Sequence, residues 1–165
     1  MASIREGDTI PDFKLTYVPY NAEAPDVCGV PQTLSTHKYF AGKKIVLFGV
    51  PGAFTPTCSE QHFPGYIEKY NDIVSKGVDK IICVATNDHF VMDAWGKKNK
   101  VEDRIIMASD ALYELGNALG LLQENKRLKR FAMIINDLKV ETIGVEPPNK
   151  GGVTVSGAEH ILSKL

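Results

Sequence analysis

Two apolar runs in the first half of the chain restrict most strongly how it can fold. Residues 45–50 (IVLFGV) and 80–85 (KIICVA) have the length of a strand and are apolar at almost every position. This pattern is typical of strands that are buried on both faces, as in sheets covered by two helical layers. Pro51-Gly52 ends the first run, and residues 57–74 then form a predicted helix with a kink at Pro64-Gly65.

The remaining segments predict how the sheet is completed. Further strands are expected at residues 105–108, 131–135 and 139–145, and further helices at residues 88–99, 111–119 and 155–162. The last two strands form a hairpin that turns at Asn136-Asp137. Residues 1–40 contain four prolines and are predicted to be an irregular, turn-rich segment. This order predicts an α/β protein with a mixed central sheet flanked by helices, the arrangement of the thioredoxin fold.

Size and charge exclude several classes of function. The 165 residues suit a single domain over residues 1–165, and the net charge of −1 offers no basis for binding nucleic acid or an anionic membrane. No apolar run approaches the roughly 18 to 20 residues that span a bilayer. Residues 1–7 are too polar for a signal peptide, so we expect an intracellular protein.

The chain has three widely spaced cysteines, Cys28, Cys58 and Cys83. Their spacing matches no zinc motif, and an odd number without a secretory signal argues against a structural disulfide framework. Each cysteine is therefore either a buried apolar side chain or a reactive thiol. Cys83 lies within an apolar strand and is predicted to be an inert core residue.

Cys58 is placed where a thiol becomes reactive. It follows the loop Pro51-Gly52-Ala53-Phe54-Thr55-Pro56-Thr57, which leads from a buried strand into a helix. The first turn of a helix offers unpaired backbone N–H groups and the positive end of the helix dipole, and both favour a thiolate. Because the thiolate is the nucleophilic form, Cys58 is a candidate nucleophile, with simple packing at a helix start as the alternative.

The residue three positions before Cys58 separates two kinds of thiol chemistry. A dithiol exchange enzyme of this fold carries C-x-x-C, whereas here Thr55 occupies the first position. This argues against a thioredoxin-like disulfide reductase. A threonine hydroxyl at this position is able to hydrogen-bond both a thiolate and an incoming oxygen substrate.

These motifs resemble those of the peroxiredoxins. The string PGAFTPTC at residues 51–58 carries the PxxxTxxC signature of that family, and SEQHFPGY at residues 59–66 is similar to its type II, peroxiredoxin-five-like subgroup, including fungal members. The similarity continues through residues 87–88, 94–96 and 128–131 and so covers nearly the whole chain. It implies a thioredoxin-like fold and a thiol-dependent peroxidase that reduces hydrogen peroxide and alkyl hydroperoxides, with no cofactor.

The resemblance also assigns a role to each site residue. Cys58 would attack the O–O bond and become a sulfenic acid, and Thr55 would orient the peroxide and the thiolate. Pro51 would shield the thiolate from water and from over-oxidation. Arg130 would reach the site from the start of a later strand and stabilise negative charge. His62 lies on the same helix face as Cys58, where we expect packing or hydrogen bonding rather than a Cys–His pair.

How the sulfenic acid is resolved is less determined by the sequence. Many type II relatives carry a second cysteine near the C-terminus, but here the region holds Val153-Thr154-Val155-Ser156 and no cysteine follows Cys83. Several fungal members have an early cysteine like Cys28 that resolves the sulfenic acid of a partner subunit. We therefore expect a Cys28–Cys58 disulfide between subunits of a homodimer, with a one-cysteine cycle as the alternative. Thioredoxin, glutaredoxin or glutathione would be the reductant.

The last three residues are Ser163, Lys164 and Leu165. A C-terminal S-K-L is a peroxisomal address that an import receptor reads, so we expect a peroxisomal protein, with the cytoplasm as the alternative. A function of a different class uses the same residues: a redox sensor or interaction protein in which oxidation of Cys58 transmits a signal. Turnover of peroxide with a thiol reductant separates the two.

Overall fold

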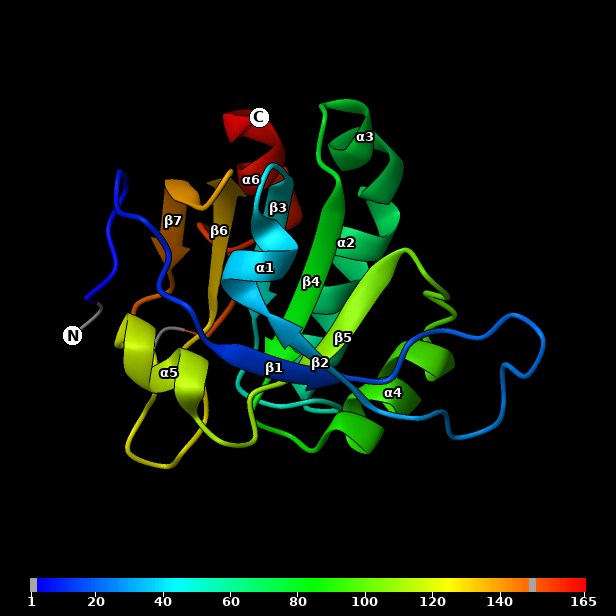
Figure 1. The fold of residues 1–165 in the computed structure, drawn as a ribbon. Helices are drawn as coiled ribbons and strands as arrows, with labels where there is room; N and C mark the ends of the chain where they lie inside the picture. The colour runs from blue at the N-terminus through cyan, green and yellow to red at the C-terminus, as the bar shows by residue number, and fades with distance from the viewer. Residues whose placement is uncertain (1–2, 149–150) are drawn as a thin grey trace.

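The computed structural model describes residues 3–148 and 151–165, which form a mixed sheet with helices on both faces (Figure 1). The strands are β1 (Lys14–Tyr17), β2 (Gln32–Ser35), β3 (Lys44–Gly49), β4 (Lys80–Ala85), β5 (Ile105–Ser109), β6 (Phe131–Asn136) and β7 (Lys139–Val145). The helices are α1 (Thr36–Phe40), α2 (Phe63–Glu68), α3 (Tyr70–Ser75), α4 (His89–Lys98), α5 (Glu114–Leu119) and α6 (Ala158–Lys164), with a π-helical turn, η1 (Cys58–His62), before α2.

The strand order is β2-β1-β5-β4-β3-β6-β7. The central strands β3, β4 and β5 run parallel, whereas β6 pairs antiparallel with β3, and β1 pairs antiparallel with β5. The two apolar runs are thus neighbours in the middle of the sheet, which is why both of their faces are covered. The predicted α/β arrangement with a mixed central sheet is confirmed.

Side chains of the central strands alternate between two cores. Val46 and Phe48 of β3 pack with α2, α3, α4 and α6, whereas Ile45 and Leu47 pack on the opposite face with α1 and α5. In Figure 1, α1 and α5 lie in front of the sheet, and α2, α3 and α6 lie behind it. All four of these β3 side chains are fully buried, so the loop of residues 50–57, which leads from β3 to Cys58, starts from a rigid strand.

The prediction that residues 1–40 are irregular holds for residues 3–13 and 18–31 and is wrong for the rest of the described segment. The segment contains β1, β2 and α1, and β1 pairs with β2 from Lys14↔Ser35 to Tyr17↔Gln32. These strands are only four residues long, lie at one edge of the sheet and carry several polar side chains. Such short strands show too few apolar positions for a periodic pattern, and their stability comes from pairing with residues far along the chain.

The helix predicted at residues 57–74 is divided into three pieces. It opens with η1, in which the Phe63 N–H donates to the Cys58 carbonyl, and it breaks again at Lys69 between α2 and α3. Pro64 has no N–H with which to continue an α-helical ladder, and a π-type turn before a proline accommodates the lost bond. The irregularity expected at Pro64-Gly65 therefore lies just before it, in the turn that holds Cys58.

Other boundaries differ by a few residues. The helix predicted at 111–119 begins at Glu114, because Tyr113 adopts a left-handed conformation (φ 60°), and the closing helix begins at Ala158. The β6–β7 hairpin is confirmed, but its turn lies one residue later than predicted: Asn136 still pairs with Lys139, and the two turn residues are Asp137 and Leu138, which both have positive φ as in a tight hairpin. Among the described residues, no helix has the length and apolar character needed to cross a bilayer.

Candidate active site

Cys58 is the first residue of η1 and is only 1 % exposed. Two hydrogen bonds that involve side chains help to hold the loop between β3 and η1 in place. The Ala53 N–H donates to Asn87 Oδ1 at 2.9 Å, and the Thr55 hydroxyl donates to the Gly52 carbonyl at 2.6 Å. The buried strand, the pinned loop and the helical turn together fix the position of the Cys58 sulfur.

Arg130 is brought to Cys58 by the pairing of β3 with β6. Phe131 is the register partner of Gly49, so Arg130 stands at the end of β3 from which the active-site loop starts. A side chain at position 49 would overlap the Phe131 ring, and glycine is what permits this close approach. Arg130 Nη2 donates a hydrogen bond to Cys58 Sγ at 3.3 Å across 72 residues of sequence. A guanidinium at this distance stabilises a thiolate.

His62 holds the other arm of the same guanidinium. Arg130 Nη1 lies 3.1 Å from His62 Nδ1, and His62 Nε2 lies 2.9 Å from the Ser156 carbonyl. Because arginine only donates, Nδ1 must accept and Nε2 must carry the proton. Burial, together with the charge of Arg130, lowers the pKa of His62 to about 3. The imidazole is therefore neutral at physiological pH, and the expected hydrogen-bonding role of His62 agrees with this geometry.

A buried carboxylate fixes the segment that His62 contacts. Glu146 accepts four hydrogen bonds: from the N–H and the hydroxyl of Thr154 at 2.6 and 2.7 Å, and from the N–H and the hydroxyl of Ser156 at 3.0 and 2.8 Å. Burial alone would raise the pKa of Glu146, but these hydrogen bonds outweigh it and hold the pKa below its ordinary value. We call Glu146, Thr154 and Ser156 the carboxylate clamp. Tyr66 also donates to the Ser156 carbonyl, at 2.7 Å.

The other predicted site residues lie in two loops, and the third cysteine lies in the core. Pro51 and Thr55 are half-buried in the loop before Cys58; the Thr55 proton is directed at Gly52, and no Thr55–Cys58 hydrogen bond is formed among the described residues. Cys28 is exposed in the loop between β1 and β2 and is a free thiol. Cys83 is fully buried, and this burial raises its pKa well above the ordinary value, as expected of an inert core thiol.

Three residues support the site in ways that the sequence did not predict, although two of them, Tyr66 and Asn87, lie within the motifs that resemble the family. Asn87 pins the loop, Tyr66 supports the Ser156 carbonyl, and Glu146 organises residues 154–156. Each contacts the site through backbone groups, which carry no residue-specific pattern. A buried glutamate after a strand is the one unusual feature, and it becomes informative only once its partners are known.

Comparison with known proteins places this geometry in a family. A family model described as Redoxin matches residues 5–162. Peroxiredoxin-2B of Arabidopsis thaliana is 44% identical, with all of both chains covered, and peroxiredoxin Pen c 3 of Penicillium citrinum is 38% identical, with 99% of each covered. The chain belongs to the peroxiredoxin family. It is accordingly a thiol-dependent peroxidase.

Solved peroxiredoxin structures agree with the fold. Reduced Prx3 of Vibrio vulnificus in complex with H2O2 is 41% identical and has a TM-score of 0.86, with 97% of this chain and 98% of that chain covered. Peroxiredoxin 5 of Alvinella pompejana is 32% identical and has a TM-score of 0.79, with 98% and 97% covered. The predicted thioredoxin-like fold is confirmed for this peroxiredoxin.

The carboxylate clamp leads to the first testable prediction. In Glu146→Gln, one carboxylate oxygen becomes an amide nitrogen that cannot accept the hydrogen bonds of Thr154 and Ser156. We expect the free energy of unfolding of this peroxiredoxin to fall by about 1–3 kcal/mol, because one acceptor is lost and the remaining bonds, which include those of the buried Ser156, lose the carboxylate charge. Urea unfolding measures it. The matched control is Glu6→Gln, an exposed site where a change within about 0.5 kcal/mol is expected; an equal loss in both variants would contradict the clamp.

Proposed function

We propose that this peroxiredoxin reduces hydrogen peroxide and alkyl hydroperoxides with Cys58 as the nucleophile. The Cys58 thiolate attacks one peroxide oxygen, the O–O bond breaks, and the sulfur becomes a sulfenic acid. The second oxygen leaves with the bonding electron pair and takes up a proton, as water or an alcohol. The observation that supports this most is the 3.3 Å contact between Arg130 Nη2 and the buried Cys58 sulfur at the start of η1.

The positive charge of Arg130 is favourable both before and during the attack on the peroxide. Because His62 is neutral, it orients the guanidinium without neutralising it, so the full positive charge faces Cys58. Before attack this charge stabilises the thiolate. During attack it stabilises the negative charge that develops on the departing oxygen, a contribution that is large in a site shielded from water.

Thr55 and Pro51 complete the proposed site. The Thr55 hydroxyl gives its only proton to the Gly52 carbonyl, so its oxygen is left to accept a hydrogen bond. A hydroperoxide carries such a donor, and Thr55 thereby selects an orientation of the substrate. Pro51 contributes no N–H to the loop and is half-buried, and from its position in the family motif we assign it the shielding of the thiolate from water.

Multiple turnover distinguishes a peroxidase from a redox sensor. With excess thiol reductant, the protein should consume many equivalents of peroxide, and omission of the reductant should stop consumption after about one equivalent per Cys58. Consumption that ends at one equivalent even with reductant present would favour the sensor.

We propose further that Cys28 of a partner subunit resolves the Cys58 sulfenic acid within a homodimer. Val27 and Val30 flank Cys28 and are 63% and 80% exposed, which suits a segment that a second subunit covers. Phe54, in the loop before Cys58, is also half-exposed and lies against Trp95 of α4. Apolar side chains near both cysteines favour association of two copies.

Resolution by Cys28 predicts a crosslink that depends on that residue. Peroxide treatment should give a covalent dimer on non-reducing gels, which a thiol reductant dissolves. Cys28→Ser should lose this band, keep the first peroxide-consuming step and oxidise more readily to the sulfinic acid at Cys58. Cys83→Ala is the control and should retain the band. If the parent protein never crosslinks and Cys28→Ser cycles normally with thioredoxin, the enzyme uses one cysteine.

We propose that the protein is imported into peroxisomes through Ser163, Lys164 and Leu165. Ser163 and Lys164 are exposed, whereas Leu165 packs partly against the core beside α6. A receptor that reads an extended tripeptide requires this last turn to unwind, which costs little at a chain end. A peroxisomal location would suit a peroxide-reducing enzyme, because peroxisomes generate peroxide.

Import is tested with two variants of a tagged protein. Deletion of residues 163–165 should shift the protein from peroxisomes to cytosol while peroxidase activity in vitro is retained. Lys164→Glu should do the same and leaves the packed Leu165 in place, which separates loss of the signal from loss of a core contact. An unaltered distribution of both variants would mean that the tripeptide is not read.

A further inference from the structure

Glu146 is connected to Arg130 through both the backbone and the side chain of the arginine. Its backbone N–H donates to the Arg130 carbonyl at 2.9 Å, one residue beyond the last pair of β6 and β7. Its carboxylate holds Ser156 in the carboxylate clamp. The Ser156 carbonyl accepts from His62, which in turn accepts from the Arg130 guanidinium. The bonds therefore run from the Arg130 backbone through three residues and back to its side chain. We call Arg130, Glu146, Ser156 and His62 the Arg130 network.

The hydrogen bonds of the Arg130 network are shielded from solvent. Ser156 and His62 are fully buried and Glu146 is only 9% exposed. Among the residues that the structure describes, no buried side-chain nitrogen or oxygen lacks a hydrogen-bond partner. Tyr66 adds a second donor to the Ser156 carbonyl at 2.7 Å. Hydrogen bonds in such surroundings are stronger than in water, so a satisfied network keeps its members in one arrangement. The guanidinium is thus held by groups that are themselves fixed in place.

Glu146 holds the guanidinium without neutralising it. In the described part of the chain, no ion pair joins Glu146 to Arg130. The carboxylate oxygens accept from Thr154 and Ser156 instead, and a neutral imidazole makes the contact with the guanidinium. A direct ion pair would compete with the Cys58 thiolate for the positive charge, whereas this arrangement leaves the charge to the sulfur.

We propose that Glu146 is a positioning residue of the peroxidase reaction. It acts through Ser156 and His62 to hold the Arg130 guanidinium against the Cys58 sulfur. This role rests on the proposed attack by Cys58 and adds to it a residue that acts only through others. A misplacement of about 1 Å in a preorganised group can cost about 100-fold in rate. Loss of the Glu146 carboxylate should therefore slow peroxide attack although the arginine itself is retained.

Glu146→Ala removes all four hydrogen bonds of the carboxylate. The rate constant of the first turnover, measured by rapid mixing with hydrogen peroxide and alkylation of the remaining Cys58 thiol, should fall at least about tenfold. The direction of the change separates two causes. Removal of a negative charge near Arg130 would by itself favour the thiolate and the departing oxygen, so it would not slow attack. A rate equal to or above that of the parent would overturn the positioning role.

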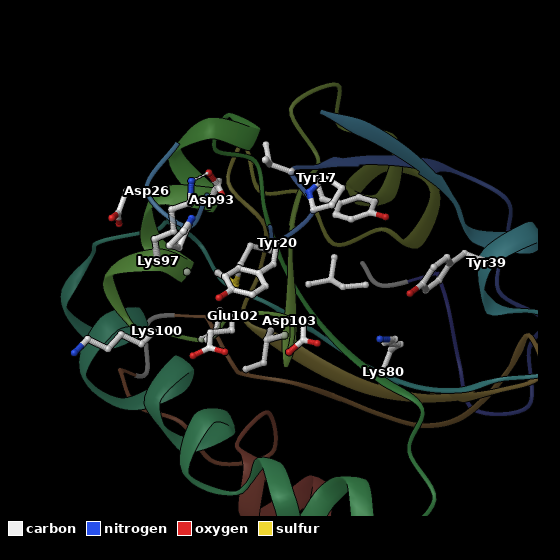
Figure 2. Close-up of a pocket in the computed structure, with 18 residues that line it drawn as sticks. Tyr17, Tyr20, Asp26, Tyr39, Lys80, Asp93, Lys97, Lys100, Glu102 and Asp103 are labelled. Carbon is white, nitrogen blue, oxygen red and sulfur yellow. Dashed lines mark ion pairs between the residues drawn. The ribbon is translucent and has the colours of Figure 1, made fainter. Parts of the chain in front are cut away.

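Two further variants separate positioning from a general loss of stability. Glu146→Gln keeps an oxygen at the place of Oε1, which accepts three of the four bonds, so its rate should return to within about threefold of the parent. The matched control is Asp93→Ala. The Asp93 carboxylate is largely buried and pairs with Lys97 at 2.7 Å, beside a cavity that no member of the Arg130 network lines (Figure 2). This control should attack peroxide at the parent rate. An equal slowing in Asp93→Ala, or no recovery in Glu146→Gln, would contradict positioning by Glu146.

The route through Arg130 is tested by repeating Glu146→Ala in the Arg130→Gln background. Because Glu146 acts through Arg130, the second substitution should change the rate by less than about twofold there. The same fold-loss in both backgrounds would show that Glu146 acts by another route and would overturn the proposal. If circular dichroism shows that Glu146→Ala does not fold, Glu146→Asp takes its place, since it keeps the charge but draws the carboxylate back by one methylene.

The outcomes distinguish this role from the proposed function on which it rests. If Arg130→Gln slows attack and Glu146→Ala does not, the positioning role of Glu146 fails while the proposed function stands. If Cys58→Ser still reduces peroxide at the parent rate, the proposed function itself fails.

Discussion

Cys58→Ser is expected to abolish peroxide reduction. A serine hydroxyl remains protonated at neutral pH and is a far weaker nucleophile than a thiolate. Since enzymes commonly accelerate their reactions by 10⁶-fold or more, kcat/KM for hydrogen peroxide should fall by at least about 10³-fold. Peroxide consumption in the presence of excess dithiothreitol measures this.

The folded state should survive this substitution, because serine is close to cysteine in size and position 58 lies in a turn that backbone bonds hold. Cys83→Ala is the matched control: it also removes a buried thiol, but activity should stay within about twofold of the parent, since Cys83 belongs to the core. Turnover by Cys58→Ser close to that of the parent would show that another group attacks the peroxide.

Arg130→Gln is expected to have the second largest effect. The variant loses the guanidinium, whose Nη2 lies 3.3 Å from the Cys58 sulfur and whose Nη1 donates a hydrogen bond to His62 Nδ1. Removal of one preorganised donor of this kind costs on the order of 10²-fold in rate, and peroxide attack should slow by that much or more.

Two further substitutions separate charge from geometry. Arg130→Lys keeps a positive charge but lacks the planar fork that reaches sulfur and imidazole together, so its rate should lie between those of the parent and Arg130→Gln. Arg5→Gln removes an exposed arginine and should leave the rate unchanged. Equal rates of peroxide attack for Arg130→Gln and the parent would show that Arg130 does not contribute to the attack.

Local patterns in the sequence were enough to predict the centre of the fold. Continuous apolar runs predict β3 and β4 because both faces of these strands are covered, and the hairpin of β6 and β7 is predicted with its turn one residue too early. β1 and β2 were missed because four-residue edge strands gain their stability from pairing partners that no local pattern reveals. The break at Lys69 and the π-turn at Cys58–His62 likewise depend on packing and on Pro64.

The residues of the candidate site likewise fall into those that a local pattern predicts and those that only the folded chain brings together. Cys58 is predicted by its position at a helix start, and Thr55 by the missing C-x-x-C, whereas Arg130 required resemblance to a family, since 72 residues separate it from the sulfur. Glu146 and Ser156 act through backbone groups and hydrogen bonds formed only in the folded chain, so their part in holding His62 had no counterpart in the sequence.

Mass spectrometry of the protein after one equivalent of hydrogen peroxide tests the central claim most directly. Peptide mapping after rapid trapping of sulfenic acids should place the oxidation at Cys58, either as a trapped sulfenic acid or as a disulfide with Cys28. Cys83 should remain a thiol throughout. Oxidation that begins at Cys28 or Cys83 while Cys58 stays reduced would contradict the assignment of Cys58 as the nucleophile.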